Sequence, residues 1–425
     1  MTKITCRFDI HPVGQGLFYT GRVNDYHFVY DCGTDSGTQY SQVAVDNCGL
    51  AETPLDLLII SHFHADHMNA VKALLTRTKG IKRVILPYLF PAERLMAAAG
   101  YAIANDLDGV NDEYVAFLAD PVEYLRGNGA DDATFTLLRP EEAVNDWPNP
   151  QGQSAGEYGW YPDDPLDKAD VAELAQTPQF VELREHSSIY RVPLWGFKFY
   201  CQPGRASAAD IRKQLASLTP PIDVADIPRV LRDRLDDLKD VYHALFDGSA
   251  GQNSTSVVCC HGPAAPRGNG DHPLHGEARV CLSVSLPSPA PTPAHWSECL
   301  CGHCFFDWHG WWHRLGNGRF LLPPLQLLTG DANLKPKEFQ THFAAELDAI
   351  GLVLLPHHGS KHNWRKGFPK MMPNCQLWVA SFGLGNRHKH PSKAVVDAVV
   401  AANRQLQLSN EVQHVAIAAD GWRWP

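Results

Sequence analysis

Four potential metal ligands lie within six residues, directly after a short apolar run. Residues 61–67 read SHFHADH, so His62, His64, Asp66 and His67 supply three imidazoles and one carboxylate. Zinc, manganese and iron accept these ligands in proteins. Residues i and i+2 of an extended loop face the same side, so we expect His62 and His64 to share one ion. Asp66 and His67, which follow, can bind a second ion. The alternative is a solvated polar turn, but four such side chains seldom gather by chance.

Polar side chains also follow two later apolar runs that are suited to buried strands. Asp331 comes after residues 320–328, and the pair His357-His358 comes after residues 351–355. Polar groups just past strand ends converge at one edge of an α/β sheet, where sites commonly form. We therefore expect these residues to join the 61–67 segment in one site.

The roles of the later histidines stay open from spacing alone. Adjacent residues leave a strand in opposite directions, so one of His357 and His358 should bind metal while the other contacts either the substrate or a metal ligand. His390 could donate a proton or contact a phosphate. A surface histidine that precedes a proline is an equally good interpretation of His390.

The elements that must position these residues alternate between strands and helices. Residues 55–60 and 84–86 are apolar runs typical of buried strands, and residues 68–75 between them have helical character. Strand, loop, helix and strand in this order indicate an α/β layer. We expect one domain over 1–425, with a helical insertion at about 91–250. A second insertion at about 259–318 is rich in proline, cysteine and histidine and should be partly flexible.

At this point the sequence resembles a known family. The stretch His62–His67 fits the H-x-H-x-D-H signature of the metallo-β-lactamase superfamily. Tyr30–Gly33, Leu328–Asp331 and Pro356–Ser360 resemble further motifs of that superfamily, in its order. Within it, the details are similar to the soluble nuclease-like domain of bacterial competence (DNA-uptake) proteins. That similarity rests on a V-G-Q-G opening at Val13–Gly16, on the H-H-G-S motif, and on a late His-Pro-Ser.

The resemblance implies a four-layer αββα metallo-β-lactamase sandwich with two divalent ions, zinc or manganese. In such sites two ions about 3.5–4 Å apart hold a hydroxide that attacks carbon or phosphorus. Asp331 would bridge the ions, and Asp66 would also orient the nucleophile, beside His358 and His390 as catalytic groups. The implied metal ligands are His62, His64, Asp66, His67, Asp331 and His357.

Other residues would support these ligands without binding metal. The resemblance gives Asp31 such a role through hydrogen bonding, and Ser360 and Lys361 adjoin the late histidine motif. Many superfamily members have one more metal-binding histidine, for which His186 is a candidate and His261 a weaker one. Without it the first ion has fewer nitrogen ligands, which favours manganese over zinc.

The cysteines raise the question of a separate structural zinc. Cys299, Cys301 and Cys304 include a C-x-x-C, and Cys259 with His261 or Cys281 could complete a set of four ligands. The second knuckle lacks standard spacing. Buried or redox-active thiols are an equal alternative among the 11 cysteines.

Net charge and hydropathy limit the kinds of molecule that the protein is expected to bind. A net charge of −10 disfavours broad binding to nucleic acid, which needs a basic field. Lys361, Arg387 and Lys389 flank the late motifs and suit an anionic substrate, including a nucleotide or nucleic acid, although solvated surface residues would look the same. We see neither a membrane span nor a signal peptide, so we expect a cytoplasmic protein. The insertions could bind a protein partner.

The favoured activity is therefore metal-dependent hydrolysis of phosphodiester bonds, as in a nuclease or phosphodiesterase. Hydrolysis of a carboxylic ester, lactone or thioester is the alternative on the same fold, because the fold alone does not fix the substrate. A metal-containing regulatory or binding module without hydrolysis is the alternative from another class.

Overall fold

The computed structural model describes most of the chain, including every sequence segment expected to carry the main metal ligands. The described ranges are residues 2–139, 181–185, 189–192, 195–246 apart from 203 and 205, 255–263, 279–285, and 325–424 apart from 336. His186, Cys299, Cys301 and Cys304 lie outside them.

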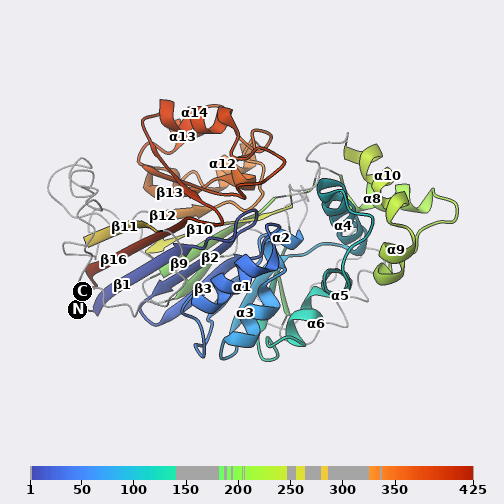
Figure 1. The fold of residues 1–425 in the computed structure, drawn as a ribbon, viewed down its shortest axis with the longest axis horizontal. Helices are drawn as coiled ribbons and strands as arrows, with labels where there is room; N and C mark the ends of the chain where they lie inside the picture. Colours follow the sequence, from blue (N-terminus) through green and yellow to red (C-terminus); the bar gives the residue numbers. More distant parts are fainter. Residues whose placement is uncertain are drawn as a thin grey trace, which may run out of the picture.

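Two β-sheets form the centre of the structure (Figure 1). In the nine-stranded sheet the order is β11-β16-β1-β2-β3-β4-β5-β6-β7, antiparallel as far as β3 and parallel from β3 onward. Its strands are β1 (Thr2–Ile10), β2 (Phe18–Val23), β3 (Tyr26–Cys32), β4 (Leu57–Ile59), β5 (Arg83–Pro87), β6 (Thr134–Arg139), β7 (Val181–Glu185), β11 (Arg279–Ser285) and β16 (His414–Trp424).

The seven-stranded sheet has the order β15-β14-β13-β12-β10-β9-β8 and is parallel from β12 to β15. Its strands are β8 (Ile189–Val192), β9 (Trp195–Cys201), β10 (Val257–Pro263), β12 (Leu325–Leu328), β13 (Ile350–Leu354), β14 (Leu377–Ser381) and β15 (Gln405–Ser409). The carboxyl ends of β4 in one sheet and of β12 and β13 in the other precede the expected ligand segments, and Asp31 lies near the end of β3.

Three separate apolar clusters divide the molecule into four layers. One lies between the sheets and includes Phe8, Phe197 and Leu354. A second lies between the nine-stranded sheet and helices α1 (Thr38–Asn47) and α3 (Val71–Arg77). The third lies between the seven-stranded sheet and its helices, which are α12 (Lys337–His342), α13 (Phe368–Met371) and α14 (Lys393–Ala401). The expected αββα sandwich is therefore confirmed.

The alternation of strand β10 shows how the sequence builds two of these interfaces at once. Val257 and Cys259 face the core between the sheets, whereas Val258 and Cys260 face the outer helices. Successive side chains of a strand point to opposite faces, so a strand that is covered on both sides is apolar throughout.

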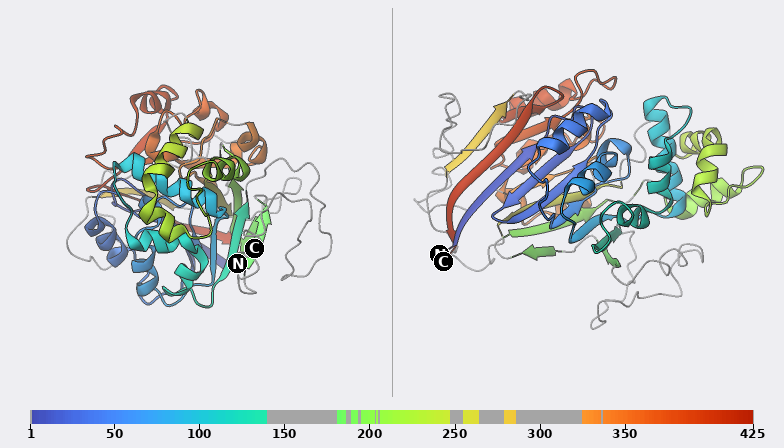
Figure 2. Two further views of the ribbon diagram at one scale, coloured as in Figure 1. Left: turned by 90° about the vertical axis from the view of Figure 1, so that its right-hand side faces the viewer. Right: turned by 60° about the horizontal axis from the view of Figure 1, so that its bottom comes forward.

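A helical group stands at one end of the sandwich (Figures 1 and 2). It contains α4 (Pro91–Asn105), α5 (Asp112–Ala119), α6 (Pro121–Arg126), α8 (Ala208–Ala216), α9 (Ile227–Asp233) and α10 (Leu235–Phe246). Buried residues of these helices share one apolar cluster with the nine-stranded sheet. Among the described residues, no helix combines the length and hydropathy that crossing a membrane requires.

The expected insertions differ from the structure in their extent. Strands β6 to β9 lie within 91–250 and belong to the two sheets, so the helices form two separate pieces of sequence. Strand β11 and most of β10 lie within 259–318 and are likewise sheet strands. Pairing with distant strands, which composition does not reveal, decides these assignments.

Candidate metal centre

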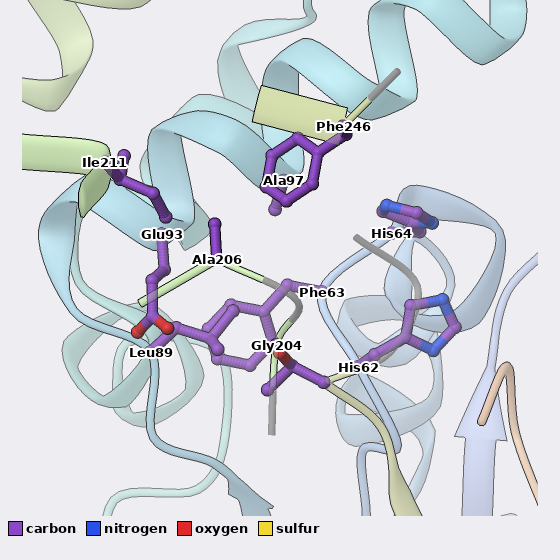
Figure 3. Close-up of a pocket in the computed structure, with 11 residues that line it drawn as sticks. His62, Phe63, His64, Leu89, Glu93, Ala97, Gly204, Ala206, Ile211 and Phe246 are labelled. Carbon is purple, nitrogen blue, oxygen red and sulfur yellow. The ribbon is translucent and has the colours of Figure 1, made fainter. Parts of the chain in front are cut away.

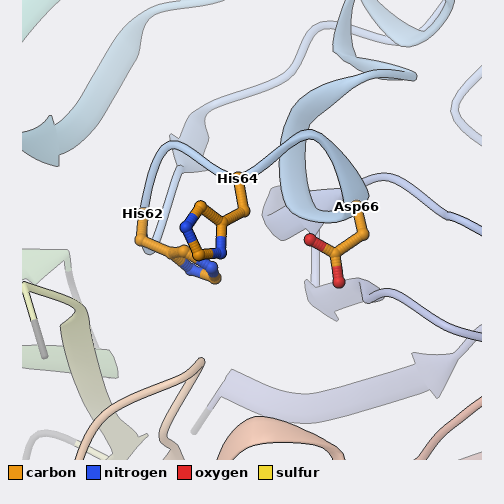
Figure 4. A group of neighbouring side chains, drawn as sticks. All are labelled: His62, His64 and Asp66. Atoms are coloured by element: carbon orange, nitrogen blue, oxygen red, sulfur yellow. The ribbon is translucent and has the colours of Figure 1, made fainter. Parts of the chain in front are cut away.

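The 61–67 segment connects β4 to a short helix, α2 (Ala65–Met68). His62 and His64 lie in the extended connection, whereas Asp66 and His67 lie in the helix. All four side chains are buried, and Figure 4 shows the rings of His62 and His64 on the same side of the loop as Asp66. The turn from extended chain to helix keeps Asp66 within reach of His62 and His64, since ligand atoms of these three residues lie within 4.8 Å of one another.

Asp331 reaches this segment from the other sheet. It follows β12 by way of Gly330, whose φ of +49° turns the chain. The Ser256 hydroxyl accepts the Asp331 backbone N–H at 3.2 Å, and the Asn363 amide donates to the Asp331 carbonyl at 2.7 Å. Asp331 Oδ2 lies 3.5 Å from His62 Nε2, and its Oδ1 lies 3.4 Å from His67 Nε2. The carboxylate therefore lies between two histidines of the loop.

His357 and His358 lie after β13 in a tight turn rather than in a strand. Their φ values are +46° and +55°, so the rule that neighbours point in opposite directions does not apply. His358 Nε2 lies 3.2 Å from Asp66 Oδ2, and its Nδ1 lies 2.9 Å from the Ser381 carbonyl. His357 Nδ1 lies 3.3 Å from Asp331 Oδ2. Both rings therefore lie close to carboxylates of the centre, His358 to Asp66 and His357 to Asp331.

Within the described part of the chain, three sets of side chains have ligand atoms close enough to hold an ion. Within each set the atoms lie within 4.8 Å of one another. All the residues involved are buried, and the sets share members, so they form one continuous centre. The sets are His62, His64 and Asp66; His62, His67 and Asp331; and Asp66, His67 and His358.

Burial and mutual attraction shift the pKa values of this centre in opposite directions. Burial lowers the pKa of His62 well below its ordinary value. Burial also opposes protonation of His67, but the carboxylates of Asp66, Asp31 and Asp331 raise its pKa well above the ordinary value. Burial disfavours charged Asp331, yet the neighbouring histidines keep its pKa well below the usual range. Buried carboxylates of this kind require nearby positive charge.

The donor atoms fit divalent cations. Among the described residues, His62 Nε2 and His67 Nε2 are buried without a hydrogen-bond partner. A buried polar atom in this situation costs roughly 1–3 kcal/mol. Imidazole nitrogens together with carboxylate oxygens suit zinc or manganese, and a cation would supply the missing partner to both histidines.

Asp31 orients two histidines of the 61–67 segment through hydrogen bonds. Its carboxylate accepts the backbone N–H and the hydroxyl of Ser61, both at 2.6 Å, and lies 2.8 Å from His67 Nδ1. The Ser61 hydroxyl also lies 2.9 Å from His62 Nδ1. Asp31 therefore fixes two imidazoles with their Nε2 atoms toward the centre. Residue spacing in the sequence did not predict the role of Ser61, although this residue directly follows the apolar run that forms β4.

Two glycines allow close packing against the backbone of Asp66. A Cβ on Gly33 would lie 2.6 Å from the Asp66 carbonyl carbon, and one on Gly16 would lie 2.6 Å from the Asp66 carbonyl oxygen. Gly16 also has a φ of +144°. Side chains at these positions would displace the loop, which gives a physical reason for the V-G-Q-G and D-C-G segments.

His390 lies beside the centre on the side of His357. The two rings are 5.5 Å apart, and His390 Nδ1 has no hydrogen-bond partner among the described residues. Burial and His357 lower the pKa of His390 to about 3, which favours its neutral form. Ser360 is buried in the same turn, and its hydroxyl accepts the His362 backbone N–H at 3.2 Å.

The basic residues expected near the late motifs lie on the surface. Lys361, Arg387 and Lys389 are all exposed. The Arg387 guanidinium donates to the Ala104 carbonyl at the end of α4. The loop that carries His390 is therefore tied to the helical group.

Asp35 also contacts the helical group, although no sequence motif pointed to this residue. Its carboxylate accepts the hydroxyl of Tyr101 at 3.0 Å and the amide of Asn105 at 3.2 Å, both from α4. Burial and the negative charge of Asp66 raise the pKa of Asp35 to about 7.

His261, the weaker candidate for an extra ligand, lies in the core between the sheets. Its Nε2 lies 3.0 Å from the Tyr19 hydroxyl, and its Nδ1 accepts the Trp195 indole N–H at 3.2 Å. The Tyr19 hydroxyl in turn donates to the Gln326 side chain at 2.9 Å. Both nitrogens are engaged in the core, so His261 is not an extra ligand. The knuckle suggested by Cys259 and His261 is a stretch of buried strand instead.

A pocket opens beside His62 and His64 (Figure 3). The loop of the centre supplies one wall, and the helical group supplies the other. The lining residues are His62, Phe63, His64, Leu89, Glu93, Ala97, Gly204, Ala206, Ile211, Phe246 and Thr255.

Comparisons with known proteins agree with this architecture. Residues 13–138 match the family model described as the metallo-beta-lactamase superfamily, a region that ends with β6. No curated protein is similar to the chain in sequence.

Several solved structures align with most of this chain at low sequence identity. The metallo-beta-lactamase fold protein YhfI from Bacillus subtilis has 7% identity and a TM-score of 0.36, with 97% of this chain and 99% of that chain covered. A possible metal-dependent hydrolase from Veillonella parvula DSM 2008 has 7% identity and a TM-score of 0.35, with 97% and 98% covered. A long form RNase Z from yeast has 7% identity and a TM-score of 0.32, with 89% and 36% covered.

Proposed function

We propose that this chain, whose residues 13–138 match the metallo-β-lactamase superfamily, is an enzyme that hydrolyses phosphodiester bonds with two divalent ions. One observation carries the proposal. Side chains from the ends of strands in both sheets form three overlapping sets of ligands around Asp66, His67 and Asp331. Such a cluster suits two cations held close together rather than one.

The proposed ligands divide between two positions. His62 and His64 would hold the first ion and Asp66 and His67 the second, and Asp331, which lies close to both His62 and His67, would contribute to both. We assign His358 rather than His357 to the second position, because His358 is buried and its Nε2 approaches Asp66. This assignment departs from the expectation drawn from the sequence, since the left-handed turn directs both rings inward.

Two divalent ions, when bound, supply a water of lowered pKa and neutralise charge that develops on the substrate. The residues of the chain contribute orientation. Asp31 and Ser61 hold the imidazoles of His67 and His62 in place. His390, whose Nδ1 has no partner among the described residues, would hydrogen-bond the substrate on the side of His357.

Anionic substrates suit this side of the centre. Lys361, Arg387 and Lys389 lie on the segments that adjoin His357 and His390, and a phosphodiester carries the charge that they would attract. A nucleotide or nucleic acid is therefore the favoured substrate. Hydrolysis of a carboxylic ester or thioester is a second candidate, because the pocket beside His62 and His64 has mostly apolar walls.

Metal analysis of the purified protein tests the proposal. We expect about two zinc or manganese ions per chain in the wild type, and their loss in a His62→Gln, Asp331→Asn variant. Hydrolysis of bis(p-nitrophenyl) phosphate should fall at least 100-fold in that variant. His243→Gln, an exposed position on α10, is the control and should leave both quantities unchanged. Wild-type protein that binds no metal after reconstitution would contradict the proposal. Zinc that survives in the variant would belong to a separate site.

A further inference from the structure

The two sheets are joined beside the metal centre by a buried dipeptide. Ser256 directly precedes β10, Val257 is the first residue of that strand, and both are fully buried. The Val257 backbone N–H donates at 2.7 Å to the carbonyl of Ser61, which begins the 61–67 segment after β4. The Ser256 hydroxyl accepts the Asp331 backbone N–H at 3.2 Å. One dipeptide therefore contacts the ligand segments of both sheets.

Tyr30 holds this dipeptide from the nine-stranded sheet. It lies on β3, next to Asp31, and is fully buried. Its hydroxyl donates to the Val257 carbonyl at 2.7 Å. Burial and the negative charge of Asp31 raise the pKa of Tyr30 well above its ordinary value, so the hydroxyl keeps its proton and remains a donor. Both backbone groups of Val257 are thus bonded to segments of the other sheet.

The surroundings of Gly330 show how closely the two sheets approach at this point. A Cβ on Gly330 would lie 2.6 Å from the Ser256 hydroxyl oxygen and 2.8 Å from the Cβ of Ser61. Gly330 directly precedes Asp331, and Ser61 directly precedes His62. Across this contact, His62 Nε2 and Asp331 Oδ2 are 3.5 Å apart. A displacement of one sheet relative to the other would therefore change the distance between two proposed metal ligands.

We propose that Tyr30 is a positioning residue of the metal centre, whose hydroxyl sets the separation of His62 and Asp331 by holding the Ser256–Val257 dipeptide. The inference rests on the proposed two-ion centre and deepens it. Metal–ligand distances in proteins lie within about 0.2 Å of their preferred values, so a small displacement of the sheets weakens the fit of an ion. Loss of contacts that orient ligands typically costs about 10–100-fold in metal affinity or activity.

Tyr30→Phe tests the inference, with Tyr19→Phe as the matched control. Tyr19 is also fully buried between the sheets, and its hydroxyl bonds to His261 within β10 and Gln326 within β12. Both variants therefore lose a buried hydroxyl that joins the two sheets. Competition with a chromophoric chelator measures the zinc affinity of the full-length protein. We expect this affinity to fall about tenfold in Tyr30→Phe and to stay within about twofold in Tyr19→Phe.

Two results would overturn the inference. One is a zinc affinity of Tyr30→Phe equal to that of the wild type. The other is an equal fall in both variants, which would show general loosening of the sheets. Cobalt-substituted protein adds a readout of ligand geometry that a loss of stability alone does not change. The visible bands of bound Co²⁺ should shift in Tyr30→Phe and match the wild type in Tyr19→Phe.

Ser256→Ala is the second variant, and it also serves if Tyr30→Phe does not fold. It removes the acceptor of the Asp331 backbone N–H, so zinc affinity should fall here as well. The double variant should lose less affinity than the product of the two single losses, because both residues act through one dipeptide. Strictly multiplicative losses would show that Tyr30 and Ser256 act independently, which contradicts the inference.

Metal binding and hydrolysis separate this inference from the proposed function. Zinc affinity that depends on Tyr30, in protein that hydrolyses no diester, would refute the function and leave the positioning role supported. Hydrolysis of bis(p-nitrophenyl) phosphate by the wild type, with zinc affinity and cobalt bands unchanged in Tyr30→Phe, would refute the positioning role alone.

Discussion

At the scale of single residues, the metal centre depends on backbone contacts as well as on side chains. Gly33 packs against the backbone of Asp66, and the Leu17 N–H donates to the Asp66 carbonyl at 3.2 Å. The position of the Asp66 carboxylate is therefore fixed through its main chain. Interiors are close-packed, so a single added methyl group at Gly33 has no space to occupy.

Gly33→Ala should lower the free energy of unfolding by about 1–3 kcal/mol, the usual cost of overpacking. It should also weaken metal binding, because the loop that carries Asp66 must move. Urea unfolding measures the first effect, and competition with a chromophoric chelator measures the second. Gly109→Ala is the control, because Gly109 is exposed and a Cβ there meets nothing within 4 Å. Gly33→Ala protein with wild-type stability and affinity would show that the loop does not require this packing.

The sequence revealed the ligand types but not all of their partners. The H-x-H-x-D-H segment could be identified because its residues are contiguous and chemically specific. Ser61 and Asn363 could not, since serine and asparagine are common and their hydrogen bonds to Asp31 and to the Asp331 carbonyl arise only from the fold. The directions of the His357 and His358 side chains could not be predicted from the sequence either, because they depend on positive φ values.

At the scale of elements, the helical group is joined internally by a buried arginine. Arg94 of α4 is 1% exposed. Its guanidinium donates to the carbonyls of Leu118 and Ala119 at 2.8 and 2.6 Å. These carbonyls belong to the last turn of α5, where a helix lacks internal donors and carries partial negative charge. Arg94 therefore fixes α5 against the helix that lines the pocket.

Arg94→Met keeps most of the apolar volume of the side chain but removes the donors. We expect the free energy of unfolding to fall by about 1.5–3 kcal/mol, as for hydrogen bonds from a charged group. Limited proteolysis should cut within 91–126 earlier than in the wild type. Lys72→Met, at an exposed position of α3, serves for comparison. An Arg94→Met variant as resistant and as stable as the wild type would argue against this role.

The order of the elements explains which parts of the fold were predictable. The strands that lead into the ligand segments are short apolar runs with polar ends, and they form as expected. Strands β6 and β10 were assigned to insertions, although they pair within the two sheets. In β10 the residues Cys259, Cys260 and His261 suggested metal chemistry. Their burial follows from distant strands and helices that local sequence does not specify.

At the scale of the whole molecule, buried neutral histidines make stability depend on pH. Burial lowers the pKa of His11 from 6.5 to about 3 and that of His261 from 6.5 to about 3. Between these values the unfolded chain binds protons that the folded chain does not. Each group therefore contributes stability that is present above about pH 6.5 and is lost as the pH falls toward 3.

We expect the free energy of unfolding of metal-free protein to decrease between pH 6.5 and pH 5 by up to about 1.4 kcal/mol per pH unit for each such histidine. Replacement of His11 by Gln should reduce this slope by the contribution of about one histidine, whereas replacement of the exposed His243 should leave the slope unchanged. Urea midpoints at pH 7, 6 and 5 provide the measurement. A slope that His11→Gln leaves unchanged would show that His11 is not responsible.

The position of the metal centre between the two sheets has a consequence for the energetics of the whole chain. His62 and Asp331 are 269 positions apart, as 331 minus 62, and the unfolded chain would not hold them together. Ions bound there favour the folded chain by mass action, at about 2.7 kcal/mol when the free ion is at 100 times its dissociation constant. The unfolding temperature should therefore follow the concentration of free metal. The centre would therefore join two distant segments of the chain more or less strongly as the supply of ions changes.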